Sequence, residues 1–148
     1  MTLPLSLLNC FWLMIPVLLW NLVLGPRITD PRITSDKHSP AWLREAENVS
    51  RIIVFAFPLL LPLQWDDALS KAGLVIYLVG TLSYFASWLP LLLASDSAWS
   101  NHSAGLLAPR LTPFLAFLGI ALTGHSWLYG VLAAVFIVLH TWHGLQNL

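Results

Sequence analysis

The sequence predicts an all-α integral membrane protein, a bundle of five transmembrane helices that forms a single domain. Of its 148 residues, 57% are hydrophobic and only 9% are charged, and the mean hydropathy is +0.74. A chain of this length cannot bury so much apolar surface in its own core, so part of that surface must face lipid. Long apolar runs also separate the five charged residues that follow Arg51, namely Asp66, Asp67, Lys71, Asp96 and Arg110.

The first predicted span covers residues 3–24, an apolar run that contains Pro16 and ends at Gly25-Pro26. No basic residue precedes this run and no small-residue cleavage pattern follows it, so we expect a retained helix rather than a signal peptide. Pro16 is expected to kink the helix. The next segment, 26–39, is rich in charge and has no apolar periodicity, which predicts a solvated loop.

The second predicted span covers residues 40–64 and begins at Ser39-Pro40. This dipeptide favours a helix start, because serine caps the N-terminus and proline is tolerated in the first turn. The span passes through charged residues before its apolar part. Pro58 and Pro62 are expected to bend or unwind its far end.

Three further spans are predicted over residues 73–94, 108–123 and 127–145. The first of these is the clearest, since about 22 residues give roughly 33 Å of helix, enough to cross the hydrocarbon core. The next is short and contains Pro113 and Gly119. The alternative topology therefore has four crossings, with this segment re-entrant or interfacial.

The distribution of basic residues predicts the orientation. Six of the seven fall on the first and third loops or their adjoining helix ends, on one side of a five-span bundle, and Lys71 alone falls on the other. The positive-inside rule then places the N-terminus outside and the C-terminus in the cytoplasm. The six are Arg27, Arg32, Lys37, Arg44, Arg51 and Arg110.

Composition restricts the partners. Basic and acidic residues number seven each, so the charge favours no nucleic-acid partner. Cys10 is the only cysteine, which excludes an internal disulfide and a multi-thiolate metal site. We expect membrane lipids, an apolar small molecule, and a second copy or another membrane protein as partners. No motif identifies a cofactor.

Charged residues on the second predicted helix are the first candidate site. Glu47 and Arg51 are spaced i,i+4 in the favourable order and can neutralise each other. Glu45 and Asn48 lie on the adjacent ridge. Because charges at membrane depth are costly, we interpret this group as a ligand site in which Glu45 exchanges protons and Asn48 and Arg51 contact the ligand. The alternative is a set of snorkelling charges that anchor a helix end.

Two other helices carry polar stripes. On the third helix, four aromatic and hydroxyl side chains share a face with small residues, which predicts a surface turned into the bundle for packing or for a flat ligand. On the fifth helix, two histidines one turn apart favour proton exchange at one and ligand contact at the other, with metal or haem ligation or interfacial packing as alternatives. These residues are Tyr77, Thr81, Tyr84 and Trp88, and His140 and His143.

The third predicted loop, 95–110, is rich in hydrogen-bonding groups, including Trp99 and His102. With five spans it falls on the same side of the membrane as Glu45, Arg51 and the two histidines. We therefore expect these residues to converge on a polar, cytoplasm-facing site that includes Trp99 and His102 as ligand contacts. The alternative is a solvated loop.

Several short motifs lie along the middle of the chain: Glu47-Asn48, Arg51-Ile52-Ile53-Val54-Phe55, Pro58, Tyr84-Phe85, Ser87-Trp88, Trp99-Ser100, Pro109 and Thr112-Pro113. Together they resemble motifs of small multi-pass bacterial membrane proteins of uncharacterised function. The resemblance covers the second to fourth predicted helices and implies a bacterial inner-membrane location but no activity.

The leading functional hypothesis is a pocket that binds or modifies a lipophilic, lipid-like molecule, with Glu45 or His140 exchanging protons and Arg51 holding an anionic head. The first alternative is a structural or regulatory subunit whose third helix docks another chain. A weaker alternative is a small transporter or channel component, since few charged residues are available to line an ion path.

Overall fold

The fold is all-helical over residues 7–34 and 39–148, the part of the chain that the computed structural model describes. Apart from one isolated bridge between Asn9 and Pro62, its regular elements are helices. In chain order these are α1 (Phe11–Leu24), η1 (Gly25–Arg27), α2 (Pro31–Thr34), α3 (Ala41–Ala56), η2 (Phe57–Leu60), α4 (Ala68–Leu93), α5 (Ala98–Asn101), α6 (Ser103–Leu111), α7 (Pro113–Thr123) and α8 (Trp127–Gln146).

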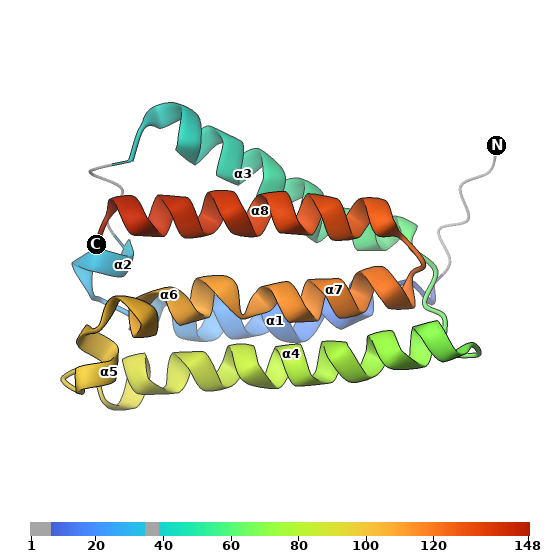
Figure 1. Cartoon of the computed structure of the whole chain (residues 1–148), viewed down its shortest axis with the longest axis horizontal. Helices are drawn as coiled ribbons and strands as arrows, with labels where there is room; N and C mark the ends of the chain where they lie inside the picture. Colours follow the sequence, from blue (N-terminus) through green and yellow to red (C-terminus); the bar gives the residue numbers. More distant parts are fainter. Residues whose placement is uncertain (1–6, 35–38) are drawn as a thin grey trace.

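The helices α1, α3, α4, α6–α7 and α8 run between the same two ends of the molecule (Figure 1). One end holds α2, α5 and the C-terminus, and we call it the α2 end. The opposite end holds the connection that precedes α4 and the turn between α7 and α8. Within the bundle α4 packs against α7, α3 packs against α8, and α7 packs against α8.

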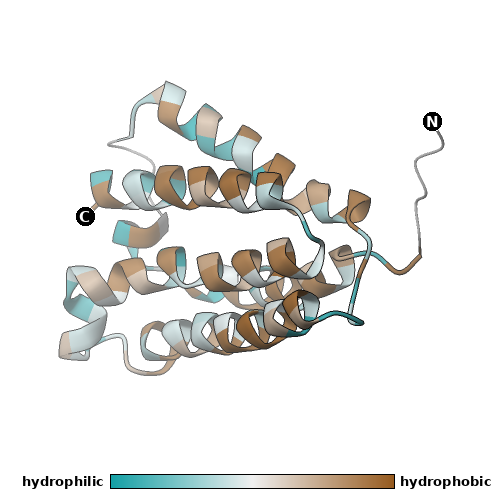
Figure 2. Ribbon diagram, turned by 45° about the vertical axis from the view of Figure 1, so that its right-hand side comes forward, coloured by the Kyte–Doolittle hydropathy of each residue, from teal (hydrophilic) through white to brown (hydrophobic). Residues whose placement is uncertain are grey.

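Among the residues that the structure describes, three helical stretches are long and apolar enough to span a membrane, namely Ala68–Leu93, Ser103–Thr123 and Trp127–Gln146. They are fewer than the five predicted, and they correspond to the third, fourth and fifth predicted spans. Apolar residues dominate their length, whereas polar residues gather toward the ends (Figure 2). Large apolar side chains stay exposed on α4 and α8, as a lipid-facing surface requires: Val75, Leu78, Val79, Leu82, Val131, Val135 and Val138.

The first predicted span coincides with a shorter apolar helix, Phe11–Arg27. At roughly 1.5 Å per residue, its 17 residues reach about 25 Å, less than the hydrocarbon core. Helix α1 begins at Phe11, because Leu8 and Cys10 form backbone hydrogen bonds with the segment that precedes α4. The Cys10 N–H donates to the Leu61 carbonyl over 2.8 Å, and the Leu63 N–H donates to the Leu8 carbonyl over 3.2 Å. Residues 3–6 of this predicted span lie outside the described residues.

The second predicted span is not one continuous α-helix. It changes from α3 to the 3₁₀-helix η2 at Phe57 and becomes extended at Leu61. Pro58 has no N–H to donate, and its carbonyl accepts from the Leu61 N–H over 3.2 Å, which ends the helix. The far end of the span is thus unwound near Pro58 and Pro62, one of the two expected outcomes.

The third predicted loop, 95–110, is largely helical rather than an irregular solvated connection. Its first part forms α5, and α6 then begins at Ser103, because the His102 Nδ1 accepts from the Ala104 N–H over 3.2 Å and caps the helix. Only a turn at Thr112 separates α6 from α7. The stretch Ser103–Thr123 is therefore longer than the predicted fourth span and long enough to cross.

Small residues bring α4 and α7 into backbone contact, as the sequence predicts for the third span. A Cβ atom at Gly80 would lie 2.3 Å from the Ala116 nitrogen, and one at Gly119 would lie 2.4 Å from the Tyr77 nitrogen. Neither site has room for a methyl group. This contact places Tyr77 in the core, beside buried residues of α7 such as Phe117.

Candidate functional site

A cavity of about 410 Å³ lies among α1, α3, α4, α6, α7 and α8 toward the α2 end. Its lining includes five aromatic residues, which we call the aromatic wall: Phe55, Phe117, Phe136, Tyr84 and Trp88. It also includes five acidic and basic residues, which we call the polar wall: Glu47, Arg51, Arg110, His140 and His143. Both kinds of side chain therefore face the same space.

Glu47 is the centre of the polar wall and is only 1% exposed. Its Oε1 accepts hydrogen bonds from Arg51 Nη2 and from His140 Nδ1, the latter over 2.8 Å, and its Oε2 accepts one from His143 Nδ1. An ionised carboxylate only accepts hydrogen bonds, so both imidazoles must carry their proton on Nδ1. We call Glu47, Arg51, His140 and His143 the Glu47 cluster.

Local helix geometry and helix packing together build this cluster. On α3, Glu47 and Arg51 are one turn apart, which brings their side chains together on one face. On α8, His140 and His143 are spaced i,i+3 and face α3. The packing of α3 against α8 then joins the two pairs. The His140 ring also stacks on Phe136, with ring centroids 5.3 Å apart, which orients the imidazole.

Arg110 brings a second guanidinium to the cavity from α6. Its Nη1 donates to the His140 carbonyl and its Nη2 donates to the Ile33 carbonyl, each over 3.1 Å. Its side chain lies against Gly144, where a Cβ atom would come within 2.6 Å of the Arg110 Cδ. Arg110 therefore ties α6 to both α8 and α2.

Across the cavity, a hydrogen bond holds α1 to α4. The Tyr84 hydroxyl donates to Asn21 Oδ1 over 2.6 Å, and Asn21 Nδ2 donates to the Val17 carbonyl over 2.9 Å. The Tyr84 ring meets Trp88 edge to face, with centroids 5.9 Å apart. Ring packing and one partly buried hydrogen bond thus hold Tyr84 in position.

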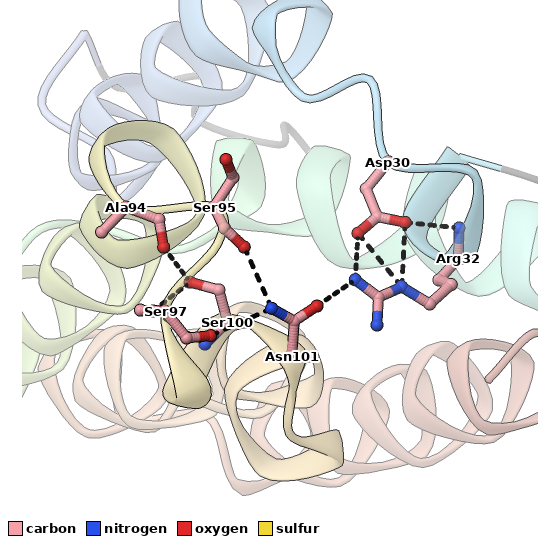
Figure 3. A network of polar contacts seen from close by, with 7 residues as sticks. All are labelled: Asp30, Arg32, Ala94, Ser95, Ser97, Ser100 and Asn101. Carbon is pink, nitrogen blue, oxygen red and sulfur yellow. Dashed lines mark hydrogen bonds and ion pairs between the residues drawn. The ribbon is translucent and has the colours of Figure 1, made fainter.

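A polar network closes the α2 end next to the cavity (Figure 3). Arg32 pairs with Asp30, with Nη2 and Oδ2 2.6 Å apart, and the same nitrogen donates to Asn101 Oδ1 over 3.1 Å. The hydrogen bond from Arg32 holds the pKa of Asp30 below its usual value. The network ties the segment before α3 to α5, and two residues of that segment, Ile28 and Ile33, line the cavity.

Five of the predicted site residues line the cavity, namely Arg51, Tyr84, Trp88, His140 and His143. The predicted convergence of the second helix with the two histidines is therefore present. Glu45 and Asn48 do not take part, because both are exposed and Glu45 lines a shallow apolar groove on another face of α3. The buried positions of α3, including Leu43, Glu47 and Val54, define its inner face, and Glu45 lies off that face. The carboxylate that faces the cavity is thus Glu47.

The remaining predicted ligand contacts also lie outside the cavity. Tyr77 and Thr81 are buried, on the stretch of α4 that packs against α7. Trp99 is half-exposed on α5, and His102 is exposed and caps α6. The third loop does approach the α2 end, but these two side chains do not line the cavity.

Sequence reasoning missed two polar residues of the cavity, Asn21 and Arg110. Asn21 is an amide within the apolar run of α1, and Arg110 is a lone charge between apolar segments. A polar group in such a setting needs a partner or a function, which was the available signal. In the described part of the chain, no group of three or more His, Cys, Asp or Glu residues is arranged to hold a metal ion.

Comparisons with protein-family models, with curated proteins and with solved structures find no match to this chain.

Proposed function

We propose that this protein binds a lipophilic small molecule in the cavity, with the polar end of the molecule at the Glu47 cluster and its apolar body against the aromatic wall. The observation that carries the proposal is that a buried carboxylate, which accepts three hydrogen bonds, and several aromatic side chains line one cavity inside a largely apolar bundle.

The size and lining of the cavity support a ligand site. Small-molecule sites commonly have volumes of roughly 300–1,000 Å³, with mostly apolar walls and a few polar groups that fix orientation. The cavity has about 410 Å³, and Phe55, Phe117 and Phe136 contribute to a largely apolar lining. Ionisable groups inside an apolar bundle are costly, so their concentration in one place favours a functional role over a purely structural one.

The membrane arrangement that fits this proposal has five passes. Besides the three long apolar helices, α1 and α3 run between the same two ends (Figure 1), so we propose that each completes a pass. By the positive-inside rule, the distribution of basic residues favours a cytoplasmic location for the α2 end and the cavity near it, with the N-terminus outside. A bacterial inner membrane suits this arrangement. Labelling of single cysteines introduced at Ser95 and Asp66, with Cys10 replaced by serine, would test the orientation in intact cells.

The alternative of a subunit that docks another chain through Tyr77, Thr81, Tyr84 and Trp88 has no support from the packing. All four side chains are buried within the chain, at 8% exposure or less. Other helices of the same chain already cover this face of α4. A docking role would therefore need a different surface, and we favour the ligand site.

Native mass spectrometry of the protein released from lipid nanodiscs tests the proposal. We expect the wild type to retain a discrete small molecule in addition to bulk lipid. Replacing Leu106, which lines the cavity, with tryptophan should fill the space and abolish retention. The matched control is Leu82→Trp, a substitution on the exposed face of α4, which should retain the molecule. Equal retention by both variants, or a wild type that carries only bulk lipid, would contradict the proposal.

A further inference from the structure

We infer that the ligand's polar end is an anion, a carboxylate or a phosphomonoester, which the Arg51 guanidinium binds while Glu47 holds that arginine in place. This inference rests on the proposed function, because it assigns the chemical class of the molecule in the same cavity.

Arg51 has unused hydrogen-bonding capacity. A guanidinium offers five N–H donors in a planar fork. Arg51 uses Nη2 to donate to Glu47, and its guanidinium makes no other hydrogen bond to the described residues. Its side chain is 42% exposed, in contrast to 2% for the side chain of Glu47. The remaining donors are therefore accessible, and their geometry matches the two oxygens of a carboxylate or a phosphate.

Glu47 is a poor counter-ion for a cationic ligand. Its two oxygens already accept three hydrogen bonds, from Arg51, His140 and His143, and its side chain is only 2% exposed. An amine that approached Glu47 would also lie beside the positive charge of Arg51, and like charges at short distance repel each other. The cluster thus disfavours cations.

Arg110 adds positive charge on the other side of His140. It donates to the carbonyl of His140, the residue whose ring donates to Glu47. The cavity lining therefore contains two guanidinium groups and one carboxylate among its described residues.

A set of amphiphiles with eleven- or twelve-carbon chains tests the inference on the wild-type protein in a neutral detergent. The probes are 11-(dansylamino)undecanoic acid and its methyl ester, and the competitors are dodecanoate, dodecyl phosphate, dodecanol and dodecylamine. We expect the acid probe to bind at least about tenfold more tightly than the ester. Dodecanoate or dodecyl phosphate should displace it, and dodecanol and dodecylamine should compete at least tenfold less well.

Substitutions of Arg51 give an independent readout. Arg51→Gln should weaken binding of the acid probe at least about tenfold and leave the ester nearly unchanged. Arg51→Lys keeps the charge but not the planar fork, so we expect an intermediate loss. The matched control is Arg44→Gln on the same helix, since Arg44 is exposed and does not line the cavity. It should bind both probes as the wild type does.

The outcomes separate this inference from the proposed function. If the ester binds as tightly as the acid, or dodecylamine competes as well as dodecanoate, the anionic class is wrong while the binding site remains. If neither probe binds, the proposed function fails and the inference fails with it. Acetate and inorganic phosphate, tested at the same concentrations, separate a free anion from an amphiphile. Displacement by either small ion alone would support the anion site and contradict a lipophilic ligand.

Discussion

Arg110 lies directly against the backbone of Gly144, at the point where α6 meets the C-terminal part of α8. A Cβ atom at Gly144 would come within 2.6 Å of Arg110 Cδ and 2.7 Å of its Nε. The absence of a side chain at Gly144 allows the guanidinium to reach the His140 and Ile33 carbonyls. One glycine on α8 thereby determines whether a second positive charge reaches the cavity.

Gly144→Ala should displace Arg110 and destabilise the protein by about 1–3 kcal/mol. Alanine favours a helix over glycine by roughly 1 kcal/mol, but hydrogen bonds of a charged group contribute about 1.5–3 kcal/mol each. Unfolding in mixed micelles with a denaturing detergent measures the difference. Gly130→Ala on the same helix is the control, because its Cβ would meet only Ala121 Cβ at an ordinary 3.5 Å. If the two variants unfold alike, the contacts of Arg110 contribute nothing to stability.

Gly80→Ala and Gly119→Ala should each destabilise the protein by about 1–3 kcal/mol or more, because the added methyl group would meet backbone atoms rather than a flexible side chain. The two helices would have to separate, and contacts along α4 and α7 would loosen together. Unfolding of each variant in mixed micelles, compared with Gly130→Ala, measures the effect. A loss no larger than that of Gly130→Ala would show that α4 and α7 do not pack this closely.

Tyr84→Phe should cost about 1–2 kcal/mol, because it removes the hydroxyl that donates to Asn21 Oδ1 over 2.6 Å in the bundle. A double-mutant cycle with Asn21→Leu isolates this contact from other effects of each substitution. We expect a coupling energy of about 1 kcal/mol. A coupling energy near zero would mean that the hydrogen bond does not hold α1 to α4.

Glu47→Gln should destabilise the protein by about 2–4 kcal/mol. The amide keeps the shape of the side chain and one acceptor oxygen. It removes the charge and replaces the other oxygen with an NH2 group, so at least one of the three donors that bond to Glu47 loses its acceptor inside the bundle. The matched control is Glu45→Gln on the same helix, where the side chain is exposed. We expect that substitution to change the free energy of unfolding by less than about 0.5 kcal/mol. Equal effects at the two positions would show that the hydrogen bonds to Glu47 do not stabilise the site.

The N-terminus of α4 should lose stability in acid. Hydrogen bonds from the Ser70 side chain and backbone N–H hold the pKa of Asp67 well below its usual value, and His125 adds to this effect. Because the folded pKa lies below the unfolded one, Asp67 contributes its full stabilisation above the unfolded value of 3.8 and loses it as the pH falls toward the folded value. The Tm of the wild type should therefore decrease between about pH 5 and pH 2.

Asp67→Asn separates the charge from the helix cap, since asparagine also caps helices well. We expect its Tm to fall less than that of the wild type over the same pH range. Asp66→Asn, at the exposed neighbouring residue, should follow the wild type. Parallel decreases for the wild type and Asp67→Asn would assign the acid sensitivity to other groups.

Much of the secondary structure could be predicted because it depends on local chemistry. The long apolar run after Lys71 became α4, the break before Trp127 became the turn into α8, and Pro58 ended the regular part of α3. The prediction of a third loop over residues 95–110 was less accurate. The cap by His102 and the short turn at Thr112 extended the fourth helix through residues that lack a clear apolar period.

The candidate site could be predicted only in part, because it combines residues that are close in the sequence with residues that are far apart in the sequence. The pair of Glu47 and Arg51 follows from helix spacing alone and is present in the structure. The choice between Glu45 and Glu47 as the inward carboxylate does not follow from spacing, since it depends on how α3 is rotated against α8. The aromatic stripe of α4 does face inward as predicted, but only Tyr84 and Trp88 of the four residues reach the cavity.

The sequence by itself determined that this is an all-helical chain with apolar helices suited to a membrane, because composition and local periodicity decide those properties. The tertiary structure alone decided which side chains meet. It joined Glu47 to His140 and His143, which are 93 and 96 residues away, and it brought Arg110 onto Gly144. The reason is physical: helix formation depends on residues a turn apart, whereas a cavity depends on the order and rotation of packed helices.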